Sequence, residues 1–348
     1  MKTKQLQSWL CMSLLLASVA HAQHARIVQT NSGSDTISLI DPATQSVVAE
    51  IKGIPVNHGA AGAPDGKHLY FSSEAKTTLE VVDTATLKII KEIPLTARPN
   101  NITIGKDGHY VYVGIMGGDG GIDVIDTQAM TKVDHIVTQT NVHNPYVTPD
   151  GKYLVAGAFG GTNNLQVFDT ATRRPVFALY PPKNGNKGDA LDGIRPITFD
   201  TNADGSTKNM YVQLSDFHGF TVVDFKSGKE IKRIDLPEIP VAERVPEGTY
   251  NRAPSHGIGV APGGKTLWVC SRLNARVYAY SLPELKLIGE VKVGDHPDWI
   301  TFSPDGKFAY AANGGSNNVS VIDIAAVKEV TRIAVGKAPK RNITAVLR

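Results

Sequence analysis

A short turn motif recurs along this chain at intervals of about 40–60 residues, and this period constrains the fold more than any other feature. The motif is Pro64-Asp65-Gly66-Lys67, and whole or altered copies stand at 106–108, 149–152, 203–205, 262–265 and 304–307. Each copy lies between a short apolar stretch and a segment rich in aromatic and β-branched residues, the pattern of a β-hairpin. A unit of this length cannot bury its faces alone, so the repeat predicts an array of small sheets that pack on one another.

A second signature marks a later strand of each unit, where an apolar residue is followed by aspartate. The pairs are Ile40-Asp41, Val82-Asp83, Ile125-Asp126, Phe168-Asp169, Val223-Asp224 and Ile322-Asp323. Because aspartate at a hairpin end bonds its own backbone, these residues are interpreted as turn formers and not as catalysts. In one further unit Tyr280-Ser281 replaces the pair, so the chain has seven such strands but six turn motifs.

The missing turn predicts how the array closes. The final segment, Ile343–Arg348, is typical of an inner strand with nothing after it, whereas Ala25–Gln29 is typical of a second strand with nothing before it. Pairing these segments would complete the seventh sheet and protect edges that otherwise stay open. The prediction is therefore an all-β fold: a seven-bladed β-propeller of one domain, residues 23–348, whose last blade is closed by the N- and C-terminal strands.

Residues 1–22 have the pattern of a cleavable signal peptide. Lys2 and Lys4 precede a short apolar run over residues 9–19, and Ala20-His21-Ala22 offers a cleavage site. The run is too short to span a bilayer, and no later run is long enough, so we expect a periplasmic or secreted protein without a membrane span. Removing two lysines leaves 34 basic residues (36 less 2) against 33 acidic ones. This balance argues against general attraction to nucleic acid.

The cysteine content excludes two kinds of structure. Cys270 is the one cysteine after residue 22, so the mature chain can form no internal disulfide. Its strand-like surroundings favour a buried thiol. No Cys-x-x-Cys-His sequence occurs, which excludes covalent attachment of a c-type haem.

The candidate site lies where each inner strand opens into the central channel. Counting back from the turns places one residue of each blade there, and these residues are Arg341, His58, Asn100, His143, Arg195, His256 and Asp298. His296 lies just before the last of them. The ends of the second strands reach the same face and contribute Glu74, Asp119, Asp216, His218, Arg272, Asn274 and Asn313. The long connections 181–194 and 236–255, with Tyr250 and Arg252 in the second, are expected to cover one side of the mouth.

Two chemistries fit this ring of side chains. Guanidinium groups suit carboxylate or phosphate, which makes Arg195, Arg341, Asn100, His58 and His143 candidates for binding a small anion. Two imidazoles and a carboxylate on neighbouring blades suit a divalent metal, with His256, His296 and Asp298 as ligands. In an enzyme, His256 or His296 would act as general base and Arg195 would stabilise an oxyanion. Alternatively, each histidine could hold an inter-blade loop by hydrogen bonds.

The segments Tyr310–Asn313 and Val319–Asp323 resemble the YVTN family of secreted bacterial β-propellers, which includes the YncE-like proteins. The resemblance covers nearly the whole mature chain and implies the same fold. Related propellers are cofactor-handling proteins, lyases, lactonases and binding modules. We therefore expect a periplasmic monomer that binds a small anionic ligand, a metal or a cofactor in the funnel. A metal-assisted lyase or lactonase is the alternative, and the resemblance adds haem or quinone to the cofactors considered. A protein-interaction platform is a third possibility, although aromatic residues make up only 7% of the chain.

Overall fold

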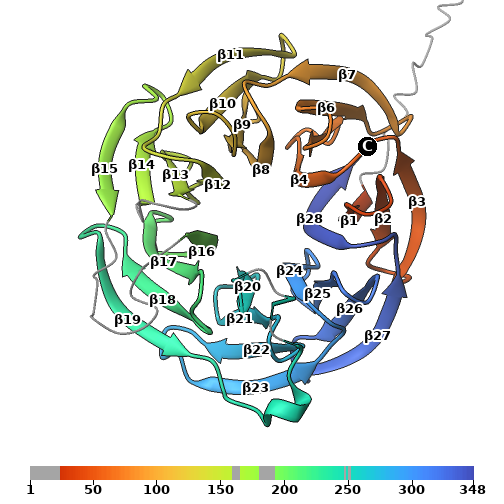
Figure 1. Cartoon of the computed structure of the whole chain (residues 1–348), viewed down its shortest axis with the longest axis vertical. Helices are drawn as coiled ribbons and strands as arrows, with labels where there is room; N and C mark the ends of the chain where they lie inside the picture. The colour runs from red at the N-terminus through yellow and green to blue at the C-terminus, as the bar shows by residue number, and fades with distance from the viewer. Residues whose placement is uncertain (1–23, 159–164, 180–192, 247, 250–251) are drawn as a thin grey trace, which may run out of the picture.

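The computed structural model describes residues 24–158, 165–179, 193–246, 248–249 and 252–348. They form seven four-stranded antiparallel sheets arranged in a ring around a central channel (Figure 1). The predicted seven-bladed β-propeller is therefore confirmed. The proposed signal peptide, residues 1–22, lies outside the described residues, so its cleavage stays a prediction.

Each blade runs from an inner strand at the channel to an outer strand at the rim, and blades are numbered along the chain. Blade 1 contains β28 (Pro339–Leu347), β1 (His24–Asn31), β2 (Thr36–Asp41) and β3 (Ser46–Lys52). Blade 2 contains β4 (Asn57–Gly62), β5 (His68–Ser73), β6 (Thr78–Asp83) and β7 (Lys88–Pro94). Blade 3 contains β8 (Pro99–Ile104), β9 (Tyr110–Ile115), β10 (Gly121–Asp126) and β11 (Thr131–Ile136).

The remaining four blades follow the same order. Blade 4 contains β12 (Val142–Val147), β13 (Tyr153–Ala158), β14 (Leu165–Asp169) and β15 (Pro175–Leu179). Blade 5 contains β16 (Ile194–Thr201), β17 (Thr207–Leu214), β18 (Gly219–Asp224) and β19 (Lys229–Asp235). Blade 6 contains β20 (Ser255–Val260), β21 (Thr266–Ser271), β22 (Arg276–Ser281) and β23 (Leu287–Lys292). Blade 7 contains β24 (Pro297–Phe302), β25 (Phe308–Asn313), β26 (Asn318–Asp323) and β27 (Lys328–Ala334).

Blade 1 closes the ring by pairing the two ends of the chain. Strand β28 lies antiparallel to β1, with Val346 opposite Ala25 and Asn342 opposite Gln29. Val28 is fully buried in the core of this blade. The predicted pairing of Ile343–Arg348 with Ala25–Gln29 is thus confirmed, and it satisfies backbone groups that an open ring would leave exposed.

The turn motifs work through local backbone chemistry. Gly66 in the first motif has φ +74°, a conformation that favours glycine, and the Asp65 carboxylate accepts a hydrogen bond from the Lys67 backbone N–H at 3.0 Å. The aspartates at the ends of the third strands bond the following turn in a similar way, as Asp83 does with Thr86. Both observations confirm that these residues form turns.

The hydrophobic core lies between the blades. One cluster joins Leu79 and Val81 of blade 2 to Val111 and Val113 of blade 3, and comparable clusters join other neighbouring blades. Cys270 is fully buried in the cluster that joins blades 6 and 7, as expected from its strand pattern.

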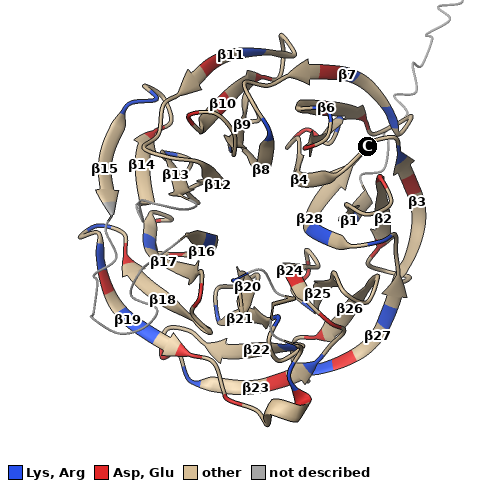
Figure 2. Ribbon diagram, viewed as in Figure 1, with Lys and Arg blue, Asp and Glu red and all other residues tan. Residues whose placement is uncertain are grey.

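Charged residues lie on the outer strands, and Figure 2 shows both signs on β3, β7, β11, β19, β23 and β27. Such charges protect edge strands from pairing with other chains. The part of the chain that the structure describes contains one 3-10 helix, η1 (Val241–Glu243), and no helix there is long and apolar enough to cross a membrane.

Candidate functional site

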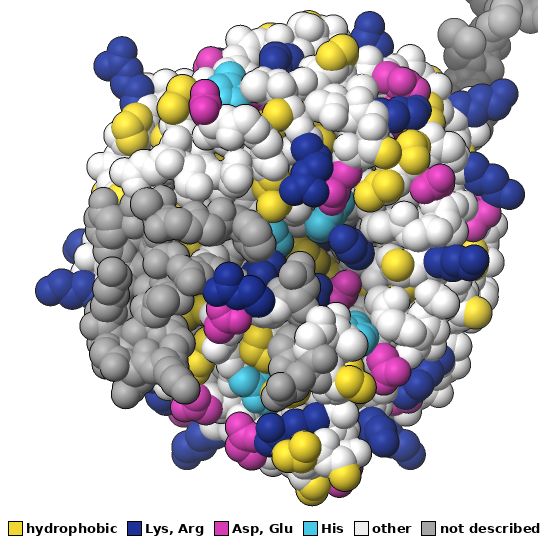
Figure 3. Space-filling view, viewed as in Figure 1, with side chains coloured by type: hydrophobic (Ala, Val, Ile, Leu, Met, Phe, Trp, Pro, Cys, Tyr) yellow, Lys and Arg dark blue, Asp and Glu magenta, His cyan; other side chains and the backbone are white. Residues whose placement is uncertain are grey.

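A cavity of about 310 Å³ opens at the centre of one face of the disc. Figure 3 shows the hollow, with histidine and basic side chains around it. Its walls come from the beginnings of the inner strands, the ends of the second strands and one inter-blade loop. The lining residues are His58, Glu74, Arg98, Asn100, Met116, His143, Arg195, His256, Arg272, Asp298, Trp299 and Lys340.

Six of the seven positions expected at the channel mouth line this cavity. Each is the second residue of its inner strand, and they are His58, Asn100, His143, Arg195, His256 and Asp298. In blade 1 the equivalent residue is Lys340 and not Arg341. Arg341 lies one residue further along the strand, and its side chain enters the channel instead of lining the cavity.

A β-bulge near the start of each inner strand directs these side chains to the cavity wall. In all seven blades the pairing register shifts there, as between Asn57 and Ala60 in β4 and between Pro297 and Trp299 in β24. Bulges bend the strand and redirect side chains, and they are common beside functional sites. In blade 7 the bulge turns two consecutive residues, Asp298 and Trp299, into the cavity wall.

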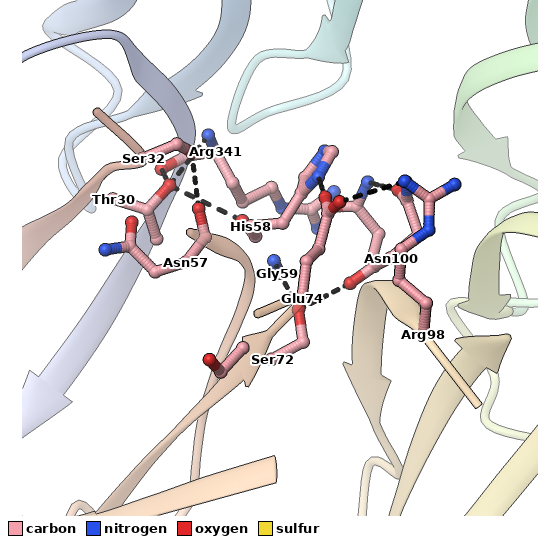
Figure 4. Close-up of polar contacts among 12 residues, drawn as sticks. Thr30, Ser32, Asn57, His58, Gly59, Ser72, Glu74, Arg98, Asn100 and Arg341 are labelled. Atoms are coloured by element: carbon pink, nitrogen blue, oxygen red, sulfur yellow. Dashed lines mark hydrogen bonds and ion pairs between the residues drawn. The ribbon is translucent and has the colours of Figure 1, made fainter. Parts of the chain in front are cut away.

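One side of the cavity is organised around His58 and Glu74. The two side chains point toward one another, and the Glu74 carboxylate also bonds Arg98 at 3.4 Å (Figure 4). Burial, assisted by the charge of Lys340, lowers the pKa of His58 to about 4. Burial alone would raise the pKa of Glu74, but His58, Lys340 and Arg98 bring it below its ordinary value. At neutral pH the pair is therefore a neutral imidazole donating to a carboxylate.

The opposite side holds two histidines in contact. The rings of His143 and His256 meet edge to face with their centroids 5.7 Å apart, and His256 also contacts Trp299 at 5.2 Å. The Nδ1 atom of His256 lies 2.7 Å from the backbone carbonyl oxygen of Asp298, so Nδ1–H donates. Burial, followed by nearby arginines, holds the pKa of both histidines well below the usual value. Both are neutral at pH 7.

Two arginines complete this side, of which Arg195 is buried and Arg272 is half-buried. Arg195 donates from Nε to the Ser215 hydroxyl at 2.8 Å, and Arg272 donates from Nε to Asp298 Oδ1 at 2.5 Å. Burial, together with repulsion from Arg272, lowers the pKa of Arg195 to about 9. The Arg195 guanidinium still carries its charge at neutral pH.

The charges of the lining residues do not cancel. Arg98, Arg195, Arg272 and Lys340 bring four positive charges, whereas Glu74 and Asp298 bring two negative ones. With the histidines neutral, the cavity carries a net charge of about +2. The low-dielectric walls strengthen the electric field of these charges inside the cavity. It is electrostatically suited to an anion.

The three predicted metal ligands are arranged differently from a metal centre. His256 and Asp298 line the cavity, but His296 does not, and its Nε2 bonds Thr249 Oγ1 at 2.9 Å on the exposed surface. Within the described ranges no group of three or more His, Cys, Asp or Glu side chains has the geometry to hold a metal ion. These three residues therefore do not fit a metal site.

Some residues at this face were foreseen and others were not. Of the second-strand ends, Glu74 and Arg272 line the cavity. His218 instead bonds Ser271 at 2.8 Å, and Arg252 pairs with Asp216 nearby. Tyr250 and the connection over 180–192 lie outside the described residues. The sequence analysis did not predict four lining residues, which are Arg98, Met116, Trp299 and Lys340. Lys340 could have been recognised, because it follows Pro339 in the same way as Asp298 follows Pro297.

Comparison with known proteins identifies the family. The profile of a family described as lactonase, seven-bladed β-propeller, matches residues 122–335, which is more than half of the chain. The chain belongs to this lactonase family. The family description agrees with the architecture seen here, a closed ring of seven blades.

Several solved structures resemble this member of the lactonase family. A chain of Kuenenia stuttgartiensis hydrazine synthase is 26% identical, with a TM-score of 0.72 over 91% of this chain and 99% of that one. The Pseudomonas aeruginosa periplasmic gluconolactonase PpgL is 19% identical, with a TM-score of 0.71 over 92% and 99%. The dihydro-heme d1 dehydrogenase NirN, in complex with DHE, is 16% identical, with a TM-score of 0.65 over 91% and 74%. At these identities the last two show the shared fold alone.

One curated relative also matches in sequence. The β subunit of hydrazine synthase from Kuenenia stuttgartiensis is 28% identical in an alignment of 126 residues, and the match covers 29% of this chain. The match spans 30% of the length of that relative.

Proposed function

We propose that the central cavity binds a small anion and that this binding underlies the function of the protein. One observation carries the proposal: four cationic side chains and two carboxylates converge with three neutral histidines on one cavity. Charges in a cleft with low-dielectric walls attract a ligand of opposite sign more strongly than exposed charges do. Arginines also recognise planar or tetrahedral oxyanions through paired N–H groups.

The size and polar groups of the cavity narrow the ligand class. Its volume, about 310 Å³, lies at the lower end of the range for small-molecule sites, which favours a metabolite over a macrocyclic cofactor. Glu74 and Asp298 offer carboxylate oxygens that accept hydrogen bonds from hydroxyl groups. Asn100 Oδ1 accepts a hydrogen bond from Asn101 at 2.8 Å, which leaves the Asn100 NH₂ group as a donor. A hydroxylated carboxylate or a phosphate ester would match this set.

Calorimetric titration with sulfate tests the proposal. The wild-type protein should bind sulfate, and R195Q should weaken binding roughly tenfold, since a partly desolvated charge contact is worth about 1.4 kcal/mol or more. R332Q removes an equal charge from the outer strand β27, where Arg332 pairs with Glu329, and should change little. Equal losses in the two variants, or no binding by the wild type up to millimolar sulfate, would overturn the proposal.

Lactone hydrolysis at the same cavity is the second candidate, and the arrangement of His256 favours it. Because its Nδ1–H donates to a carbonyl, the lone pair of the neutral imidazole lies on Nε2. Nε2 would remove a proton from water as the water oxygen attacks the lactone carbonyl carbon. Arg195 would stabilise the oxyanion, the ring C–O bond would then break, and the alkoxide would take the proton back. The product is a hydroxy acid whose carboxylate suits the cationic cavity.

Hydrolysis of D-glucono-1,5-lactone, followed by acid release in a pH-stat, tests this second candidate. H256Q should lower kcat/KM by about 10²-fold or more, as expected for loss of a general base. H109Q changes a surface histidine that bonds Asp126, and its rate should equal that of the wild type. A wild-type rate no faster than the buffer rate would remove the enzymatic role and leave anion binding intact.

The finer sequence predictions belong to this proposal as well. We propose that the chain belongs to the YVTN, YncE-like branch of secreted propellers and that the protein acts in the periplasm or is secreted. The apolar run before Ala20-His21-Ala22 supports export. N-terminal sequencing of the protein from its native host should begin at Gln23, and an intact Met1 would contradict export by cleavage. An ultraviolet-visible spectrum of the same preparation would reveal haem or quinone directly.

A further inference from the structure

Arg341 is the predicted rim residue that the structure places elsewhere. It follows Lys340 in β28, and its backbone is fixed by Thr30 of β1. The Thr30 hydroxyl accepts from Arg341 N–H and donates to the Arg341 carbonyl, both at 3.0 Å (Figure 4). This clamp lies beside the bulge of blade 1. It directs Lys340 to the cavity wall and the next side chain, Arg341, into the channel.

The guanidinium of Arg341 contacts two other blades. Its Cζ atom lies 4.3 Å from the ring centroid of Trp299 in blade 7, and it shares a hydrogen bond with the Tyr146 hydroxyl in blade 4. Blades 1 and 4 stand on opposite sides of the ring (Figure 1), so the side chain must lie across the channel. Tyr146 is three residues further along β12 than His143, which lines the cavity. Arg341 therefore lies beneath the cavity, with Trp299 belonging to both.

In the described part of the chain, the charge of Arg341 has no counter-ion. No carboxylate among the described residues pairs with it, and its buried Nε has no hydrogen-bond partner there. Arg98 and Arg272, by contrast, each pair with a carboxylate. An aromatic face stabilises a cation only modestly, and a desolvated charge without an ion partner is costly. A negative charge held above Trp299 would supply the missing compensation.

We propose that Arg341 is a specificity-determining residue that favours anions in the cavity through its field, without touching the ligand. This inference rests on the proposed anion-binding function. A ligand group on the side of Trp299 away from Arg341 would lie roughly 8 Å from the guanidinium, since van der Waals contact adds about 3.5–4 Å to the ring separation. At that distance, with an effective dielectric constant of about 20–30, a unit charge changes the affinity by roughly ten- to thirtyfold.

An effect transmitted by a field scales with the charge of the ligand. Sulfate and methanesulfonate have similar shapes and fixed charges of two and one at neutral pH. Loss of Arg341 should therefore weaken the binding of methanesulfonate by about tenfold or more and that of sulfate by about a hundredfold or more, because the interaction energy doubles. A purely structural role for Arg341 would weaken the two anions by the same factor.

Calorimetric titration of both anions into wild type, R341Q, R341K, Y146F and R332Q tests the inference. R341K keeps the charge and should retain most of the affinity if it folds. Y146F keeps the charge but loses the hydroxyl, so the ratio of the two affinities should stay near that of the wild type. R332Q is the matched control for net charge. Melting temperatures identify any variant that fails to fold, and if R341Q does not fold, R341M, which also removes the charge, replaces it in the comparison.

The outcomes separate this inference from the proposed function. If R341Q loses sulfate affinity by a factor that is the square of its loss in methanesulfonate affinity, the field effect is supported. Equal losses for the two anions, or unchanged affinities in R341Q, overturn the role of Arg341 while anion binding stands. If the wild type binds neither anion, the proposed function itself is wrong.

Discussion

The Nδ1 atom of His256 lies 2.7 Å from the backbone carbonyl oxygen of Asp298, a residue of the neighbouring blade. A carbonyl can only accept, so the neutral imidazole carries its proton on Nδ1 and its lone pair on Nε2. The same bond couples the orientation of the His256 ring to the bulge that turns Asp298 into the cavity. The propeller thus sets the tautomer of a candidate base through the packing of two blades.

The first prediction concerns the pH dependence of any hydrolysis. Burial holds the pKa of His256 well below 6.5, so the base form predominates throughout the neutral range. We expect kcat/KM to be independent of pH between about 6.5 and 8 and to fall only at more acidic pH. Initial rates across pH 4–8 in buffers of constant ionic strength provide the measurement. An acidic limb with an apparent pKa at or above 6.5 would exclude His256 as the base.

The second prediction concerns stability in acid. The pKa of His58 is about 4 in the folded protein and about 6.5 when unfolded. As pH falls through this window, the unfolded chain binds a proton that the folded protein does not, so stability is lost. This one group should cost about 3 kcal/mol between pH 7 and pH 4. The lowered pKa of Glu74 acts in the same direction below its ordinary range.

Urea unfolding of wild type and H58Q at several pH values measures this effect. H58Q should lose less stability on acidification, because one of the titrating groups is gone. His68 is the matched control, since it lies near the Asp65-Gly66 turn on the other face, and H68Q should follow the wild type. An identical pH dependence in H58Q and H68Q would show that His58 does not resist protonation.

The third prediction is that substituting one cavity residue, Glu74, raises the affinity for sulfate instead of lowering it. E74Q takes one negative charge from the cavity while Gln can still accept the hydrogen bond from His58. Sulfate affinity should rise several-fold, because the net positive charge around the ligand increases. E92Q, on the outer strand β7 of the same blade, should have little effect, since Glu92 pairs there with Lys76. Weaker sulfate binding in E74Q would contradict this electrostatic account and would mean that Glu74 is needed to position His58 and Arg98.

Most of the fold follows from local chemistry that is visible in the sequence. The Asp-Gly turns require a positive φ, and the aspartates bond the adjacent backbone. Each hairpin can therefore be recognised from its own residues alone. Because side chains on a strand alternate at a fixed period, counting back from these turns also located six of the cavity residues. The closure of blade 1 followed from the two unpaired ends.

The failures of sequence reasoning have an equally physical cause. The inner strand of blade 1 ends the chain, so no turn follows from which to count, and Arg341 was expected where Lys340 lies. Bulges add a second channel-facing residue, and the sequence does not show that Trp299 is one of them. Arg98 lies in a loop between blades, where its direction depends on the ion pair with Glu74. The metal hypothesis grouped His256 with His296 and Asp298 because they lie on neighbouring blades, but the His296 side chain bonds Thr249 instead.

The last prediction uses the two tryptophans outside residues 1–22 to locate the ligand. Trp299 lines the cavity, whereas Trp268 is fully buried and its indole N–H bonds Thr266 at 3.0 Å. An anion in the cavity would alter the field at Trp299 and its contact with Arg341, so sulfate should change the intrinsic fluorescence. The change should persist in W268F and disappear in W299F, and it should saturate with the affinity measured by calorimetry. A signal that survives in W299F would place the bound anion away from this cavity.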